Sequence, residues 1–324
     1  MPRSRLALFL PFGLIAALSA QPAMAGGGLA LVINAGSASI SVVDMGTGQE
    51  VRRIPVLREA HHWTLSPDGK SLLIGDTGGN ELLLLDPATG AVQRRVPCAD
   101  PYQLGFSPNG KVLVVNGLAR NQVDVYDANL QLVKRFPLSS MPSHLAYSPD
   151  SRRVFVTLQG TDRLAAIDLD TMQVVWNEKV GKTPAGVLWH DGKLLVANMG
   201  EESIAVVDPA DGRVIGHVHT GKGAHQIFPA PDGKLIWVNN RVAGTTVALD
   251  AATLAPVRSY NIPGGPDDIA FAPDGKLWIT RRWAEKVAVL DPATGDYETI
   301  VVGRSPHGIY LNPHGTAAAS LAQR

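Results

Sequence analysis

A unit of about 41 residues recurs seven times along this chain of 324 residues, and it constrains the fold more than any other feature. One marker of the unit is a turn sequence that reads Pro-Asp-Gly-Lys in three copies and a close variant in the other four. Its seven copies are Ser66–Lys70, Ser107–Lys111, Ser148–Arg152, Trp189–Lys193, Ala230–Lys234, Ala272–Lys276 and Asn312–Thr316. A second marker keeps the same period, an aspartate that closes an apolar run: Asp44, Asp86, Asp127, Asp168, Asp208, Asp250 and Asp291. Two markers with one period indicate a repeat architecture.

Each unit has room for four short strands. Within residues 61 to 97 we expect strands at 63–65, 71–75, 81–86 and 91–96, with a turn after the first because Pro, Asp and Gly each favour turn geometry. The second and third segments are nearly all apolar, which indicates burial on both faces, and the fourth alternates as an outer edge does. A period of 40 to 45 residues with this content predicts an all-β, seven-bladed β-propeller with four antiparallel strands per blade.

The two ends of the chain are predicted to share one blade. The N-terminal part supplies three strands, at residues 29–34, 39–44 and 51–56, and the missing first strand occurs only at 308–312. Pairing these segments closes the ring at seven blades and leaves no open end.

The first 25 residues fit a secretion signal. Arg3 and Arg5 precede an apolar run over residues 6–20, and Ala23-Met24-Ala25 fits the small-x-small cleavage pattern. The run is short for a membrane span, and no second apolar stretch follows. We therefore expect a signal peptide at 1–25, a single propeller domain at 26–324, and a periplasmic or secreted protein with no membrane span.

Charge and cysteine content exclude several classes of protein. The chain has 29 Lys+Arg and 29 Asp+Glu, and loss of Arg3 and Arg5 with the signal leaves 27 against 29, a net charge of −2. Nucleic-acid binders usually carry a basic surplus, so we expect none here. Cys98 is the single cysteine and has no partner for an internal disulfide. A closed ring needs no partner for stability, so we expect a monomer.

Four segments carry a family resemblance: Val32–Ala35, Phe155–Leu158, Val196–Met199 and Trp237–Asn240. With these segments the repeats resemble the YVTN-type propeller family along the whole mature chain. Relatives of this family include the haem-binding propeller of periplasmic cytochrome nitrite reductases, lactonases, streptogramin lyases and scaffolds. The resemblance thus implies the fold and leaves the function open.

Two adjacent positions at the start of the first strand differ most in chemistry between the repeats. Around the ring they are His61-His62, Tyr102-Gln103, Ser143-His144, Ala185-Gly186, His225-Gln226, Asp267-Asp268 and His307-Gly308. Five of the nine histidines fall in these fourteen places. The positions enter the innermost strand, so we expect them to ring one mouth of the central channel. Because neighbouring strand residues point to opposite faces, we expect only one of His61 and His62 to face the channel.

The loops between the second and third strands should share this mouth and bring arginines and Trp283 to it. Imidazole ligates metals and haem iron, Arg pairs with carboxylates, and Trp stacks on rings. The candidate ligand-binding residues are His61, His62, Tyr102, His144, His225, Asp267, Asp268, Arg281, Arg282, Trp283 and His307. His144, His225 and His307 are the candidate metal ligands, with a transition metal or a haem-like tetrapyrrole as the cofactor.

We favour a periplasmic binding propeller whose histidine-rich funnel takes a small ligand, a metal or a haem-like cofactor. A metal-dependent lactonase or lyase on the same face is the alternative, with no catalytic residue assigned. A third hypothesis is a scaffold that binds a periplasmic protein through Trp283. A hydrated funnel without chemistry also fits, with Arg241, Arg281 and Arg282 simply solvated at the surface.

Overall fold

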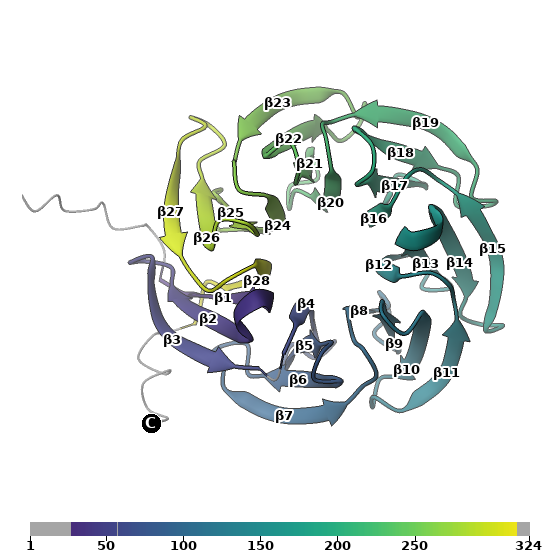
Figure 1. Cartoon of the computed structure of the whole chain (residues 1–324), viewed down its shortest axis with the longest axis horizontal. Coiled ribbons are helices and arrows are strands. Elements are labelled where there is room, and N and C mark those ends of the chain that lie inside the picture. Colours follow the sequence, from purple (N-terminus) through teal and green to yellow (C-terminus); the bar gives the residue numbers. More distant parts are fainter. Residues whose placement is uncertain (1–26, 57, 316–324) are drawn as a thin grey trace, which may run out of the picture.

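Seven four-stranded antiparallel sheets form a closed ring around a central axis (Figure 1). The computed structural model describes residues 27–56 and 58–315. The predicted all-β, seven-bladed propeller is therefore confirmed, whereas the predicted signal peptide at 1–25 lies outside the described residues.

Each blade contributes one strand to each of four concentric layers. The innermost strands are β4 (Ala60–Leu65), β8 (Gln103–Phe106), β12 (Pro142–Tyr147), β16 (Pro184–His190), β20 (Ala224–Pro229), β24 (Pro266–Phe271) and β28 (Pro306–Asn312). The second strands are β5 (Leu72–Asp76), β9 (Val112–Gly117), β13 (Arg153–Leu158), β17 (Lys193–Asn198), β21 (Leu235–Asn240), β25 (Leu277–Arg281) and β1 (Leu29–Asn34). The third strands are β6 (Glu81–Leu85), β10 (Gln122–Asp127), β14 (Arg163–Asp168), β18 (Ser203–Val207), β22 (Thr245–Asp250), β26 (Lys286–Leu290) and β2 (Ser39–Asp44). The outer strands are β7 (Val92–Pro97), β11 (Leu132–Pro137), β15 (Gln173–Lys179), β19 (Val214–His219), β23 (Pro256–Asn261), β27 (Tyr297–Val301) and β3 (Gln49–Pro55).

The closing blade joins the two ends of the chain as predicted. Strand β28 pairs antiparallel with β1, from Leu29 opposite Asn312 to Asn34 opposite Pro306. In Figure 1 the yellow strand β28 lies beside the purple strand β1. The sheet order β28-β1-β2-β3 thus gives this blade its innermost strand from the C-terminal part of the chain.

The core lies between blades rather than within one. Every residue of β5 is buried, whereas most of β7 is exposed, in agreement with the predicted inner and outer strands. Side chains of neighbouring blades form shared apolar clusters, such as Val32 of the closing blade with Trp278 of the preceding one. Burial of apolar surface contributes about 25 cal/mol per Å², so these seams supply most of the stability of the ring.

The repeated aspartates form turns, as their periodicity predicts. Asp86 accepts hydrogen bonds from the backbone N–H groups of Ala88 and Thr89 at 2.8 and 2.9 Å. Its counterparts make matching bonds, for example Asp291 with the N–H of Ala293 at 2.8 Å. These carboxylates are structural and lie on the face opposite the innermost strand entries.

Helical structure among residues 27–56 and 58–315 is confined to two short 3-10 segments, η1 (Ala35–Ser37) and η2 (Gln159–Thr161). Within these ranges, no helix has the length and apolar character needed to cross a bilayer.

Candidate functional site

In six of the seven repeats the two chemically variable positions lie at a bulge of the innermost strand, whereas β8 pairs with β9 in regular register. The register between β4 and β5 shifts between Ala60 and Trp63, and the same shift occurs between Pro266 and Ile269 in β24. It recurs in β12, β16, β20 and β28. Strand β4 begins at Ala60, three residues before the strand predicted at 63–65. Because a bulge re-aims side chains, alternation does not hold at these positions.

Neighbouring blades fix the backbone of the bulge. Asn116 Nδ2 donates to the Ser143 carbonyl at 2.9 Å, and Thr280 Oγ1 donates to the His307 carbonyl at 2.7 Å. Glycine is required where the next blade passes close: a Cβ at Gly186 would lie 2.7 Å from the His225 carbonyl oxygen. The funnel side chains therefore stand on a rigid backbone.

Five imidazoles and one phenol converge at the axis. The ring centroids of His62 lie 4.4 Å from His307, 5.0 Å from His144 and 5.3 Å from Tyr102. His61 lies 4.8 Å from Tyr102 and 5.0 Å from His307. Both His61 and His62 thus face the cluster, so the expectation that only one would do so is wrong, and the bulge is the reason.

His144 completes the cluster from the opposite side. Its ring lies 5.3 Å from that of His225, which comes from the blade after next. The intervening blade carries only Ala185 and Gly186 at these positions, which leaves room for the imidazole. Ser143 Oγ lies 2.7 Å from His144 Nδ1 and also accepts a hydrogen bond from Gln159.

Many of the imidazole nitrogens are buried without a hydrogen-bond partner among the described residues. They are His61 Nδ1, His62 Nε2, His144 Nε2, His225 Nδ1, and both ring nitrogens of His307. His307 and His144 are each 1% exposed. A buried polar group without a partner costs about 1–3 kcal/mol, so the cluster pays a free-energy penalty that a bound ligand would relieve.

Asp267 is the charged centre of the site. Its carboxylate is fully buried, contacts Arg241, and lies 3.4 Å from Arg282 Nη1. The same carboxylate lies 2.8 Å from His225 Nδ1 and 3.8 Å from His307 Nδ1. Asp267 Oδ1 lies off the direction in which His225 Nδ1 would donate, so this short contact is not a hydrogen bond. The other ring nitrogen, His225 Nε2, lies 2.7 Å from Arg241 Nη2. Donor atoms of His225, Asp267 and His307 lie within 4.8 Å of one another.

Burial sets the protonation of the cluster. It lowers the pKa of His62, His144 and His307 well below the ordinary value, and that of His61 to about 3. Burial would raise the pKa of Asp267, but the charge of Arg241 and its neighbours holds it well below its usual range. The imidazoles are therefore neutral at pH 7, the form that ligates metals.

Asp268 behaves in the opposite way. Burial and the adjacent charge of Asp267 raise the pKa of Asp268 to about 8. Its carboxyl oxygens accept from the N–H groups of Ile269 and Ile309 at 3.0 and 3.2 Å, across the seam to the closing blade. It joins blades rather than lining the axis, although it belongs to the predicted acidic pair.

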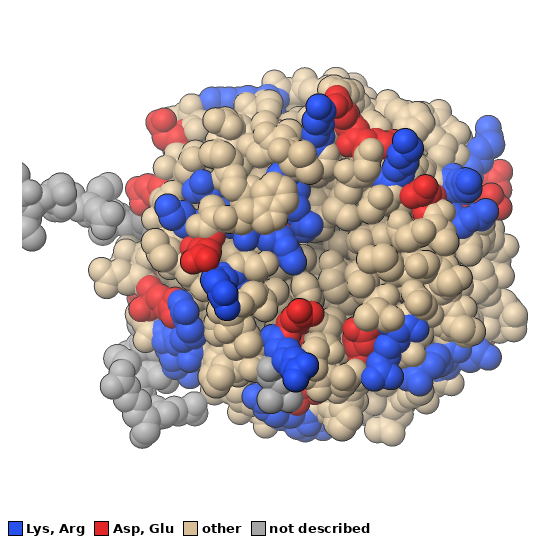
Figure 2. Space-filling view, viewed as in Figure 1, with Lys and Arg blue, Asp and Glu red and all other residues tan. Residues whose placement is uncertain are grey.

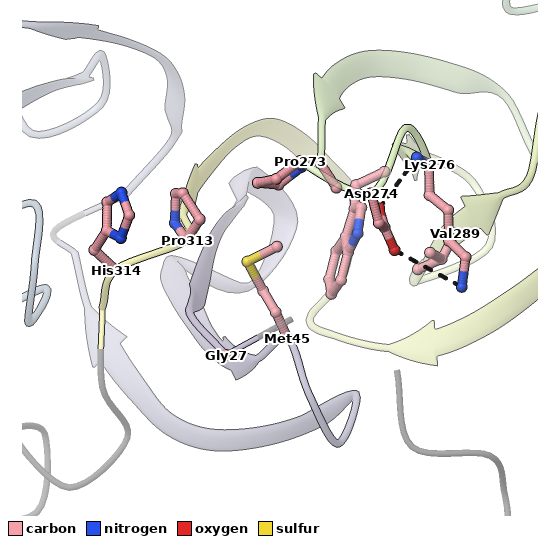
Figure 3. Close-up of a pocket in the computed structure, with 10 residues that line it drawn as sticks. Gly27, Met45, Pro273, Asp274, Lys276, Val289, Pro313 and His314 are labelled. Carbon is pink, nitrogen blue, oxygen red and sulfur yellow. Dashed lines mark hydrogen bonds and ion pairs between the residues drawn. The ribbon is translucent and has the colours of Figure 1, made fainter. Parts of the chain in front are cut away.

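A separate pocket of about 420 Å³ lies between the blade formed by β24 to β27 and the closing blade (Figure 3). Met45 and Trp278 line its apolar part, and its charged groups Asp274 and Lys276 pair with each other at 3.9 Å. The turns that form it follow the innermost strands, so it lies on the face of the ring opposite the histidines. It offers no counterpart to the unpartnered imidazoles.

Comparison with known proteins agrees with this architecture. The family model described as YNCE-like beta-propeller matches residues 7–317. The chain belongs to the YNCE-like β-propeller family. A search of curated proteins found no match. The family match establishes the fold and identifies no ligand.

Solved structures resemble this YNCE-like propeller in fold. A Desulfotomaculum acetoxidans protein described as functionally unknown has a TM-score of 0.75 and 14% identity, covering 87% of this chain and 98% of that one. The Pseudomonas aeruginosa periplasmic gluconolactonase PpgL has a TM-score of 0.69 and 18% identity, with 88% and 98% covered. The dihydro-heme d1 dehydrogenase NirN, solved in complex with DHE, has a TM-score of 0.67 and 16% identity, with 92% and 77% covered. At these identities the likeness shows the fold alone.

The loops of this YNCE-like propeller separate the predicted arginines. Arg282 turns inward to Asp267, whereas Arg281 Nε donates to the Pro263 carbonyl at 2.7 Å and its guanidinium lies 5.6 Å from the Tyr297 ring centroid. Trp283 is 59% exposed beside them. The structure therefore places Arg282 at the funnel and turns Arg281 toward the outer strand.

Arg241 is absent from the predicted ligand-binding residues, yet it contacts both Asp267 and His225. Its side chain is 16% exposed and that of Arg282 is 22% exposed, so simple solvation does not describe either residue. The available signal was the repeat itself, because Arg241 and Arg282 occupy the same position in consecutive repeats, Trp237–Asp250 and Trp278–Asp291.

Asp267→Asn is expected to lower the free energy of unfolding by about 3 kcal/mol, because the two largely buried guanidiniums would lose their carboxylate. Urea denaturation at pH 7 measures the change. Asp274→Asn is the matched control: Asp274 pairs with Lys276 at 3.9 Å in a more exposed turn, and its loss should change stability by no more than about 0.5 kcal/mol. Equal stability of the two variants would contradict the central role of Asp267.

Proposed function

We propose that this propeller is an exported binding protein that holds a transition metal, alone or at the centre of a haem-like tetrapyrrole, on its funnel histidines. The observation that carries the proposal is the set of buried, unpartnered imidazole nitrogens at the axis. Neutral imidazole is the common protein ligand for zinc, copper and iron. The secretion signal predicted at residues 1–25 supports a periplasmic location.

The donor set fits such a metal. His225, Asp267 and His307 supply two imidazoles and a carboxylate within 4.8 Å, a combination that suits zinc, copper and iron. His144 lies next to this group, 5.3 Å from His225 between ring centroids. Ser143 Oγ can donate to or accept from His144 Nδ1, so either tautomer of His144 is compatible with the contact. The predicted ligands His144, His225 and His307 thus remain the proposed set, with Asp267 beside them.

The protein purified without a histidine tag from a periplasmic fraction is expected to contain near-stoichiometric zinc, copper or iron, or to show a Soret-type absorption band. Elemental analysis and the absorption spectrum measure this directly. His307→Ala and His144→Ala should each reduce the affinity for the retained metal or cofactor by about tenfold or more, because each variant removes one of the proposed ligands.

His217→Ala is the matched control, since His217 is an exposed histidine of the outer strand β19. It should retain the wild-type metal content. Protein that neither contains metal nor retains zinc, copper or haemin after titration and dialysis would contradict the proposal. Equal losses in His217→Ala and His307→Ala would place the binding outside the funnel.

An acid–base enzyme on the same face is the second candidate, and one contact favours it. His307 Nδ1 lies 3.8 Å from Asp267 Oδ2, beyond hydrogen-bond distance, and neither ring nitrogen of His307 has a hydrogen-bond partner among the described residues. A small movement that brings the carboxylate into hydrogen-bond contact with Nδ1 would orient the imidazole and leave Nε2 free to act as a general base. His225 is less suited, because Arg241 occupies its Nε2. Turnover of a lactone panel that His307→Ala abolishes would favour this candidate over simple binding.

A further inference from the structure

Two guanidiniums share one carboxylate at the mouth of the funnel. Arg241 and Arg282 both contact Asp267, and Arg side chains are charged at every relevant pH. The second carboxyl group of the site does not balance them, because Asp268 directs its oxygens to the N–H groups of Ile269 and Ile309. One positive charge is therefore left without a carboxylate partner among the described residues at the mouth.

Arg282 is the less satisfied of the pair. Its side chain makes one hydrogen bond among the described residues, a long one of 3.4 Å to Asp267, although guanidinium offers five donors. At 22% exposure it is largely screened from solvent. Figure 2 shows basic side chains beside the central axis over β24, where the face is hollowed. An arginine with unused donors in such a position suits a carboxylate or a similar oxyanion.

An apolar rim accompanies the arginines. Val242 follows Arg241 and Trp283 follows Arg282 at the same position of consecutive repeats. These two side chains are 63% and 59% exposed, so both are accessible to a ligand at the mouth. The Trp283 ring lies over Gly265, where a Cβ would come within 2.8 Å of it, so close backbone packing holds the indole in place.

We propose that Arg241 and Arg282 form an anion subsite that takes the carboxylate of a flat, apolar ligand, with Trp283 against the ligand's ring. The guanidiniums would supply paired N–H donors to the carboxylate, and the indole would supply a stacking surface. This subsite does not require a metal on the histidines, so it can be tested apart from the metal proposal.

The experiment is calorimetric titration of metal-free protein with benzoate and 2-naphthoate, each compared with its neutral amide. We expect saturable binding of the acids at millimolar concentration or tighter, and at least tenfold weaker binding of the amides. Arg282→Gln should weaken acid binding at least tenfold, Arg282→Lys should restore part of it, and Trp283→Ala should weaken 2-naphthoate binding more than benzoate binding.

Arg304→Gln is the matched control, because Arg304 is exposed in the loop before β28 on the same face. It should bind the acids as the wild type does, and thermal melts should confirm that each variant is folded. No saturable binding of either acid, equal affinity for acid and amide, or wild-type affinity in folded Arg282→Gln would each overturn the proposal. Chelator-treated protein is used throughout, so the measured affinity for the acids does not depend on whether the histidines bind a metal.

Discussion

A chain that ends at Ser305 is expected to lose the cooperative fold of the whole propeller. It would lack β28, which pairs with the inner edge of β1. Ile309, which is fully buried, and the hydrogen bond of 2.9 Å from Trp63 Nε1 to the Ile309 carbonyl would be lost with it. The ring would then carry an open sheet edge and an exposed apolar seam on both sides of the missing strand.

Thermal denaturation followed by circular dichroism, together with binding of a hydrophobic dye, measures the effect. We expect a broad transition or none, strong dye binding and low solubility. A chain that ends at Gly315 is the matched control, because it keeps all 28 described strands and should melt as the full chain does. His307→Ala separates the loss of the strand from the loss of the funnel imidazole. A sharp, cooperative melt of the chain ending at Ser305 would show that closure by β28 is dispensable.

The fold could be predicted because the same signals recur in every repeat. A turn such as Ser66–Lys70 or an aspartate such as Asp86 is weak evidence alone, but seven copies with one period fix the number of blades. The closing blade followed from counting, since residues 29–56 supply three strands and lack a fourth. Each strand boundary depended on local pattern and lay within a few residues of the structure.

The location of the site could be predicted from the sequence, but the arrangement of its side chains could not. Repeat alignment placed the five histidines at one mouth, whereas the convergence of His61 and His62 depends on a register shift that no residue type announces. The adjacent Arg281 and Arg282 diverge because one ends strand β25 and the other begins the loop. The pairing of Arg241 with Asp267 crosses between blades, and its distance is set by packing rather than by sequence spacing.

Lowering the pH from 7 to 5 is expected to destabilise the metal-free protein by several kcal/mol. Burial lowers the pKa of His61, His62, His144 and His307 in the folded protein, while the same groups titrate near 6.5 when unfolded. Below pH 6.5 the unfolded chain therefore binds more protons than the folded one, so stability falls as the pH falls. Each histidine that stays neutral in the folded state lowers the free energy of unfolding by about 2 kcal/mol at pH 5.

Asp268 acts with the opposite sign. Because the pKa of Asp268 is raised to about 8, the folded state binds its proton more tightly, and its contribution to stability grows as the pH falls below 8. One carboxyl group offsets only part of the effect of four imidazoles, so the net slope between pH 7 and 5 should still follow the histidines.

Urea denaturation in EDTA at pH 7, 6 and 5 measures that slope. His144→Gln should reduce it by about 1.4 kcal/mol per pH unit in the range below pH 6.5, since the variant removes one proton taken up on unfolding. His217→Gln, on the exposed outer strand, should leave it unchanged. A flat stability profile between pH 7 and 5, or equal slopes in His144→Gln and the wild type, would mean that the funnel imidazoles are hydrated or already charged in the folded protein. The burial that leaves their nitrogens free for a ligand would then be absent in solution.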